Sequence, residues 1–143
     1  MAKNTLAVVG HVGLRPATEA MTSPYALSAL AALGQPTRLD IFGLLMRHEP
    51  DGLPAGAIAE EIGCPHNTLS THLAILARAR LVNGTRQGRS IIYRADIDGM
   101  RALISFLVTD CCDGHPELCN LLGDPTRSAC ERAPGAQTVK RRK

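Results

Sequence analysis

Three cysteines lie within nine residues in the last third of the chain, in the string TDCCDGHPELC: Cys111, Cys112 and Cys119. Thiolates are soft ligands that select thiophilic ions over hard cations such as magnesium or calcium. Two adjacent cysteines with a third seven residues later are an uncommon pattern for ordinary cysteines, so we expect them to bind such an ion. His115 lies in the same string, and a Cys3His zinc site of structural type is the alternative.

The cysteines also bear on the compartment and on the class of protein. Their total is five, an odd number, and adjacent cysteines suit metal or redox chemistry in a reducing cytoplasm better than a disulfide framework. None of them opens a C-x5-R loop or a CxxC pair, so we expect no thiol enzyme. Cys64 is expected at the N-cap of a helix, in a structural role, and Cys130 as a free thiol in the C-terminal tail.

Charge is divided unevenly along the chain. Residues 65–94 contain no Asp or Glu but five arginines: Arg78, Arg80, Arg86, Arg89 and Arg94. Such a stretch is typical of a surface that binds the phosphates of a nucleic acid. Residues 95–124 hold six acids against Arg101 alone, so they could face cations. The formal net charge of +3 hides this division, because the last four residues, KRRK, contribute +4.

The element that leads to the cysteines is predicted to be a helix. Its apolar side chains recur at helical spacing and form one stripe: Met100, Leu103, Ile104, Leu107 and Val108. Asp96 or Asp98 is expected to cap its start. An apolar stripe on a terminal helix indicates the seam of a homodimer.

The end of that helix decides whether the thiols meet. Successive side chains on a helix diverge by about 100°, so Cys111 and Cys112 converge on one ion only if the helix ends there. Asp113, Gly114 and Pro116 supply that end. They also reverse the chain, which could return Cys119 toward the pair.

Upstream, four helices are predicted, over residues 23–33, 36–47, 54–63 and 66–79. Ser23 with Pro24, Pro36 and Pro54 are start signals, and Gly34 and Gly63 are stop signals. The apolar residues expected to recur along the second helix are Leu39, Phe42, Leu45 and Met46.

The fourth helix follows the third after a tight turn, which is the layout of a helix-turn-helix. Leu69, Leu73 and Leu76 form its inward stripe. The opposite face is short and polar, and its groove-facing candidates are His66, Asn67, Thr68, Ser70 and Thr71. His72 is a less certain candidate because its position also packs against the preceding helix, and Arg78 at the end of the helix is a candidate phosphate ligand. A solvated polar face is the alternative interpretation.

After Leu81 the apolar period changes from 3.6 to 2, so LVNGT and SIIYRA are predicted to form the two strands of a wing. Arg86, Gln87, Gly88 and Arg89 join them, and Gly88 is free to take a positive φ. Arg86 and Arg89 flank the tip, where they are expected to contact the backbone or enter a minor groove. A solvated turn is the alternative.

These elements predict a mainly α protein with a small β-hairpin, a winged helix-turn-helix that dimerises through its N- and C-terminal helices. Residues 1–22 are expected to form a flexible arm, 23–122 the DNA-binding and dimerisation domain with the thiol sensor at its end, and 123–143 a disordered basic tail. The N-terminal run TLAVVGHVGL is a poor secretory signal, and no apolar stretch approaches the roughly 20 residues of a membrane span. Cytoplasmic localisation is therefore expected.

From residue 25 to residue 119 this order of elements resembles the ArsR/SmtB family of winged-helix metal-responsive repressors. The likeness is carried by LSTHLAILARARLV, residues 69–82, which is similar to the family's S-x-H-L-x-x-L-x-x-A-x-L-V recognition signature, and by the hairpin TRQGRSIIYR. Arsenic-responsive members often carry a cysteine pair on the helix before the recognition helix, but GLPAGAI, residues 52–58, has none. A subgroup of arsenite repressors instead carries C-C and a third Cys after the final helix, and CCDGHPELC is similar to that version.

The resemblance implies a homodimeric repressor that holds double-stranded operator DNA and releases it when As(III), or the related Sb(III), binds Cys111, Cys112 and Cys119. Arsenite takes three sulfur ligands in a pyramid, which three nearby thiols satisfy. A repressor of the same fold that senses cadmium, lead, mercury, an organoarsenical, zinc or a sulfur oxidant is the alternative.

Overall fold

The computed structural model describes residues 21–121. The expectations for the N-terminal arm up to residue 20, for the basic tail and for Cys130 lie outside those residues. The described chain divides into two compact parts, one of residues 28–96 and one of residues 21–27 with 97–121. Each part is described by itself.

Three helices of the first part begin and end where the sequence predicts. α2 (Pro36–Arg47) starts on a proline, and the side chain of Gln35 caps it by accepting a hydrogen bond of 2.8 Å from the Arg38 N–H. α3 (Ala55–Ile62) ends at Gly63, whose φ of 70° is left-handed. α4 (His66–Arg78) has Pro65 at its N-cap. The expectation that Cys64 occupies this cap is wrong, because the cap is Pro65. Proline has no backbone N–H to donate and its φ is fixed, so it suits the start of a helix.

The core of this part is aliphatic. The fully buried side chains are Ile41, Leu44, Leu45, Ile58, Leu69, Leu76, Leu81 and Val82. On α2 the inward face therefore follows Ile41, Leu44 and Leu45, whereas Leu39 and Met46 are 53% and 40% exposed. The expected stripe was partly wrong because apolar residues occupy positions 39, 41, 42 and 44–46, so the sequence of α2 admits more than one stripe at helical spacing.

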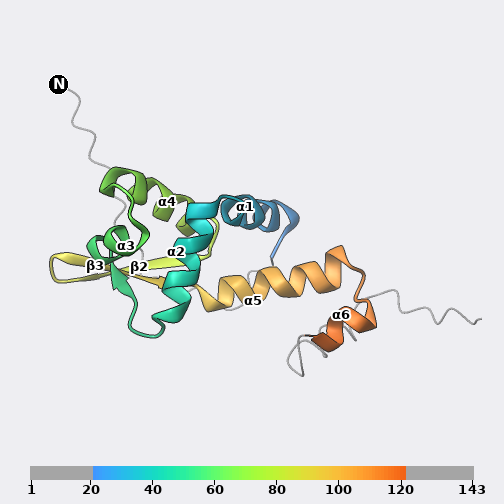
Figure 1. Ribbon diagram of the computed structural model, residues 1–143. Helices are drawn as coiled ribbons and strands as arrows, with labels where there is room; N and C mark the ends of the chain where they lie inside the picture. The colour runs from blue at the N-terminus through green and yellow to red at the C-terminus, as the bar shows by residue number, and fades with distance from the viewer. Residues whose placement is uncertain (1–20, 122–143) are drawn as a thin grey trace, which may run out of the picture. The chain divides into compact units, whose positions relative to one another are not determined.

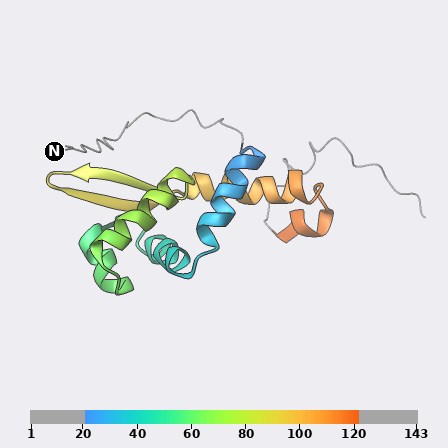
Figure 2. The same cartoon turned by 90° about the horizontal axis from the view of Figure 1, so that it is seen from above.

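A small antiparallel sheet completes the first part, as expected of a winged helix-turn-helix. β2 (Val82–Gln87) and β3 (Ser90–Ala95) pair from Val82↔Ala95 to Gln87↔Ser90, and β1 (Leu53–Pro54) pairs with the other edge of β3. The turn is Gly88 with Arg89, and Gly88 has the predicted positive φ, 60°. The hairpin projects beside α3 and α4, with its tip free (Figures 1 and 2). β1 was not predicted, because two residues show no alternation.

The loop after α2 is tied to the end of β3 by Glu49. Its Oε1 accepts a hydrogen bond of 2.8 Å from the Ala95 N–H, and Arg94 Nε donates to Pro50 O over 2.9 Å. We expect Glu49→Ala to lower the free energy of unfolding by about 1–2 kcal/mol, because it leaves a part-buried N–H without its acceptor. Urea denaturation measures this, with Glu60→Ala on the exposed face of α3 as the control. Equal losses in the two variants would contradict the role assigned to Glu49.

The second part is built from C-terminal helices. α5 (Ile97–Phe106) begins directly after Asp96, which is 7% exposed, and its inward residue is Leu103. The helix then widens into a π-helical turn, η1 (Leu107–Cys111), and a short helix, α6 (Pro116–Leu121), follows after the chain reverses (Figure 1). Neither η1 nor α6 was predicted.

The first helix, α1 (Ser23–Leu33), lies across the boundary between the two parts. It buries its alanines, Ala26, Ala29 and Ala32, and leaves Leu27 and Leu30 exposed at 64% and 42%. Within residues 21–121, no helix combines the length and apolarity that crossing a bilayer requires.

Candidate functional site

The candidate thiol site begins where α5 changes its hydrogen-bonding pattern. The Cys112 N–H donates to Leu107 O over 3.0 Å, five residues back, and the Gly114 N–H donates to Val108 O over 2.9 Å. Asp113 and Gly114 take left-handed φ values of 53° and 59°, which end the helix. The predicted stop is therefore present. Its form is a widened turn, a feature that often marks functional sites in helices.

Cys111 is the last residue of η1, and Cys112 follows it with φ −105° and ψ 15°, outside the helical repeat. Both thiols are exposed. Desolvation, the charge of the neighbouring Cys111 and a hydrogen bond with its side chain raise the pKa of the Cys112 thiol above its ordinary value. Because its pKa is raised, the Cys112 thiol is protonated at neutral pH.

The remaining ligand candidates are not assembled around this pair. Cys119 lies on α6, but its side chain is outside the described part of the structure. His115 is exposed, and its backbone N–H donates to Cys112 O over 3.2 Å. Among the described side chains, no three of His, Cys, Asp or Glu come together to hold an ion. The structure thus brings two thiols together, and the three-thiol site stays a prediction.

The predicted recognition helix presents the expected face. The exposed side chains of its N-terminal half are His66, Asn67, Thr68, Ser70 and Thr71. Ser70 Oγ and Thr71 Oγ1 donate to the carbonyl groups four residues back, at 2.9 and 3.3 Å. His72 differs, because its ring is half-buried and its Nδ1 is enclosed without a hydrogen-bond partner among the described residues.

The wing residues separate into two kinds. Arg86 Nε donates to Gly88 O over 3.2 Å, which holds this guanidinium against the turn. Arg89 instead lines a pocket of about 380 Å³ between the wing, the start of α3 and Ser70 of α4. Gln87 and Arg78 are exposed, Arg78 at the end of α4.

Sequence reasoning missed Ser90 and Tyr93, which line the same pocket. Strand alternation places Ile91 and Tyr93 on one face of β3, but it carries no sign that α3 and α4 cover that face.

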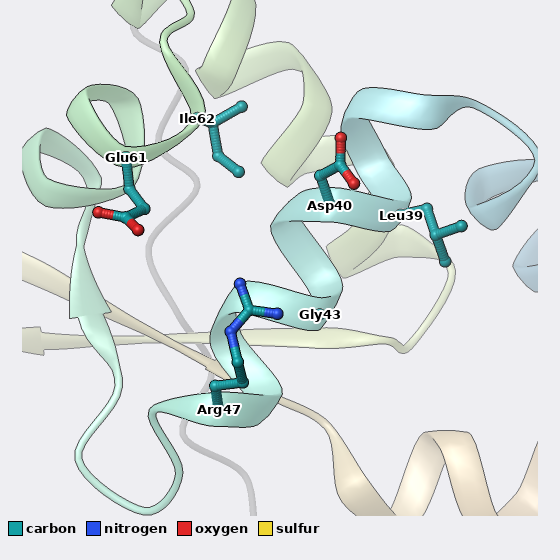
Figure 3. Close-up of a pocket in the computed structure, with 6 residues that line it drawn as sticks. All are labelled: Leu39, Asp40, Gly43, Arg47, Glu61 and Ile62. Atoms are coloured by element: carbon teal, nitrogen blue, oxygen red, sulfur yellow. The ribbon is translucent and has the colours of Figure 1, made fainter.

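A second pocket, of about 320 Å³, lies between α2 and α3 (Figure 3). Its lining residues are Leu39, Asp40, Gly43, Arg47, Glu61 and Ile62. The carboxylates of Asp40 and Glu61 outnumber the one guanidinium, from Arg47, so its charge is unsuited to a polyanion. The wing pocket and this one therefore have opposite electrostatic character.

Comparisons with known proteins find helix-turn-helix regulators. A family model described as a helix-turn-helix domain matches residues 33–85. The HTH-type transcriptional regulator NmtR of Mycobacterium tuberculosis is 44% identical over 66 residues, 46% of this chain and 52% of that protein. KmtR of the same organism, also named an HTH-type transcriptional regulator, is 35% identical over 72 residues, 50% of this chain and 53% of that protein. The matches thus span about half the length of each relative.

A solved structure from Mycobacterium bovis, Mb0332, resembles this chain with a TM-score of 0.50 and 29% identity over 64% of this chain and 82% of that one. It is described as a homodimeric winged helix-turn-helix DNA-binding domain of a possible ArsR-family transcriptional regulator. All three of these relatives are described as transcriptional regulators, in agreement with the expectation that this chain is no thiol enzyme.

Proposed function

We propose that this chain is a cytoplasmic winged helix-turn-helix repressor of the ArsR/SmtB type, whose homodimer binds operator DNA and is released by arsenite or antimonite. The inducer is proposed to bind Cys111, Cys112 and Cys119. The observation that carries this proposal is the pair of exposed thiols at the end of η1, the turn that continues α5. Soft donors placed side by side suit a thiophilic ion.

DNA binding is supported by the surface of the first part. α4 exposes hydroxyl, amide and imidazole groups, the kinds that meet base edges and phosphates. The stretch from residue 65 to residue 94 has no carboxylate to repel a polyanion. Phosphate contacts of arginine would then provide much of the affinity, and they make it dependent on salt.

A homodimer is supported by apolar surface that one chain leaves uncovered. On α1 the side chains of Tyr25, Leu27 and Leu30 are 40%, 64% and 42% exposed. On α5 and η1 the stripe of Met100, Ile104, Leu107 and Val108 is only half-buried. Pairing of these faces about a two-fold axis would place two recognition helices in successive major grooves, so the operator is proposed to be pseudo-palindromic.

The proposed ligand reaction balances without a redox step. Arsenite is present at neutral pH as As(OH)3, and three thiols replace its three hydroxyl groups. Each As–O bond that breaks releases a hydroxide, which takes up the proton of the incoming thiol and leaves as water. As(III) keeps its oxidation state and its lone pair, with three sulfurs in a pyramid. Cys119, on the helix that follows the reversal, is the proposed third ligand.

Ligand and DNA are coupled through α5, which carries the thiols at its end and the dimer face along its length. Cys111 and Cys112 precede the chain reversal and Cys119 follows it. If all three bound one ion, they would restrain the end of that helix, and this would change how the two subunits pair. The coupling is reciprocal, so DNA weakens arsenite binding as much as arsenite weakens DNA binding. Couplings of this kind are typically about 1–3 kcal/mol, roughly 5- to 150-fold in affinity.

The specific alternative is a repressor for a two-thiol ligand, such as an organoarsenical. It is favoured by one observation, that Cys111 and Cys112 are adjacent and both exposed. Cadmium, lead, mercury, zinc and a sulfur oxidant are further agents that the same thiols suit.

Titration of the DNA complex separates these ligands. Metal-free protein is bound to a labelled duplex of about 30 base pairs, selected from a random library to cover both half-sites. Arsenite, antimonite, phenylarsine oxide, cadmium and zinc are then added, and release is followed by fluorescence anisotropy. We expect arsenite and antimonite to release the duplex at the lowest concentrations. Release at lower concentrations by zinc or cadmium would contradict an arsenic sensor.

The pH dependence of release is a separate prediction. Because the pKa of Cys112 is raised, a dication must displace its proton at neutral pH. The apparent affinity for cadmium should therefore rise about tenfold per pH unit for each proton displaced, up to the thiol pKa. For arsenite the protons leave as water, so affinity should change little between about pH 6 and 8, within the range where the thiol stays protonated. Proton yield in weakly buffered solution measures the same difference, and a large yield with arsenite would contradict the reaction above.

A further inference from the structure

We propose that the pocket between the wing and the helix-turn-helix binds one backbone phosphate of duplex DNA, with the Arg89 guanidinium as its charged ligand and hydroxyl groups of Ser70 and Ser90 beside it. The inference rests on the DNA binding proposed above. It goes further by assigning a site, a ligand chemistry and separate roles to the two wing arginines.

The pocket is built by three elements of the first part. The start of α3, residues 54–56, forms one wall, Ser70 of α4 another, and residues 89–91 with Tyr93 the third. Its volume of about 380 Å³ lies within the range of pockets that take small ligands. Because α4 is the predicted recognition helix, a phosphate in this pocket would lie directly beside the groove that α4 reads.

The charge of the lining selects an anion. Arg89 is its only charged residue, and no carboxylate lines the pocket. Among residues 21–121, the Arg89 guanidinium has no hydrogen-bond or ion-pair partner. Its planar fork of N–H donors matches two oxygens of a phosphate. The α2–α3 pocket of Figure 3, where Asp40 and Glu61 face one arginine, would repel the same group.

Uncharged donors surround the arginine. Ser70 Oγ donates to His66 O over 2.9 Å, and this hydroxyl can rotate to a phosphate oxygen instead. Burial raises the pKa of Tyr93, so its phenol stays protonated and able to donate at neutral pH. Pro54 gives the first turn of α3 no side-chain cap, so backbone N–H groups of that turn add to the donors at the wall.

The two wing arginines are therefore not equivalent. Arg86 Nε is held by Gly88 O at the turn, whereas Arg89 lines the pocket on the side of α3 and α4. Of the two contacts expected of the wing arginines, with the backbone or in a minor groove, Arg89 is assigned the first, as a fixed phosphate contact. Arg86 keeps the tip position.

Phosphate neutralisation tests this site. In the selected duplex, single phosphates are replaced in turn by uncharged methylphosphonates, and the affinity of wild type, Arg89→Ala and Arg47→Ala is measured over a range of KCl concentrations. Arg47→Ala removes the same charge from the α2–α3 pocket and is the matched control. Thermal unfolding confirms that each variant is folded, and Ser90→Asp, which adds a carboxylate to the pocket while keeping Arg89, is a second variant.

We expect one phosphate in each half-site whose neutralisation weakens wild type by roughly tenfold or more. Arg89→Ala should lose that sensitivity. Its plot of log affinity against log KCl concentration should also have a slope smaller in magnitude by about 1.8, because each of the two phosphate contacts in the homodimer contributes about 0.9. Ser90→Asp should bind more weakly still, and Arg47→Ala should resemble wild type.

Three results would overturn the inference. In the first, Arg89→Ala keeps the sensitivity of wild type at every phosphate while arsenite still releases the duplex, so the proposed function survives and the pocket assignment fails. In the second, inorganic phosphate raises the melting temperature of wild type but not of Arg89→Ala, and yet no phosphate of the duplex contributes affinity that depends on Arg89. The pocket would then be a site for free anions. In the third, wild type binds no duplex at all, and the proposed function fails together with the inference.

Discussion

Joint replacement of Cys111, Cys112 and Cys119 by serine is expected to abolish release of DNA by arsenite and to leave the affinity of the ligand-free protein for DNA unchanged. The cysteines belong to the second part of the chain, whereas the residues proposed to contact DNA belong to the first, so none of the proposed DNA contacts is removed. Serine keeps the size of each side chain but offers a hard oxygen in place of a soft sulfur. Where wild type should weaken roughly 5- to 150-fold on arsenite addition, the triple variant should not respond. Anisotropy of the labelled duplex measures both quantities.

The matched control is Cys64→Ser, which removes one half-buried thiol from the first part. It should respond to arsenite as wild type does. The single variant Cys119→Ser distinguishes the ligand classes, because it should lose the response to arsenite and retain that to phenylarsine oxide, which needs two thiols. If the triple variant released the duplex at the same arsenite concentration as wild type, the thiols would not be the sensor.

The elements that sequence predicted well are those whose ends carry local signals. Pro36 and the left-handed Gly63 bound helices α2 and α3, and Gly88 forms the turn of the wing. These positions are decided by the conformational limits of proline and the freedom of glycine, which act within a few residues. The fold class followed from them together with the change of period after Leu81.

The errors concern faces and contacts, which depend on residues distant in sequence. Leu39 and Met46 lie outside the core because α3 and α4 pack on another side of α2. The pairing of β1 with β3 joins residues far apart in the chain and involves only two residues of β1. The widened turn at Leu107 was missed as well, because the apolar residues from Met100 to Val108 recur at the spacing of an uninterrupted α-helix.

For the candidate site, sequence could indicate the donors but not their arrangement. Cys111 and Cys112 are visible as a pair, and the stop at Asp113 and Gly114 was predicted and is present. The residue at which the helical repeat ends, Cys111, could be predicted only approximately from the residue types. The different surroundings of Arg86 and Arg89 could not be predicted, because both flank the same turn in sequence.

Gly52→Ala is expected to destabilise the protein by about 3 kcal/mol or more, the largest effect we predict for a single small substitution. Gly52 has a φ of 74°, which an L-residue adopts at a cost. A Cβ at this position would overlap Tyr93 O, and would lie 2.7 Å from Arg94 Cγ and 2.9 Å from Ile92 Cγ2. Backbone cannot move aside as a flexible side chain does, so β3 would have to shift. Thermal and urea unfolding measure the loss.

Gly63→Ala separates the two causes, because Gly63 has a similar φ of 70° but nothing lies within 4 Å of its added Cβ. Gly63→Ala should lower the free energy of unfolding by only about 1 kcal/mol, which is the cost of placing an L-residue at a left-handed φ. Equal losses in the two variants would show that the overlap with β3 contributes nothing. A larger loss for Gly52→Ala should be accompanied by weaker DNA binding at temperatures where the variant is folded. The strand that the new Cβ displaces carries Tyr93 and begins at the wing tip, so the contact of Gly52 with β3 helps to hold the wing in place for DNA.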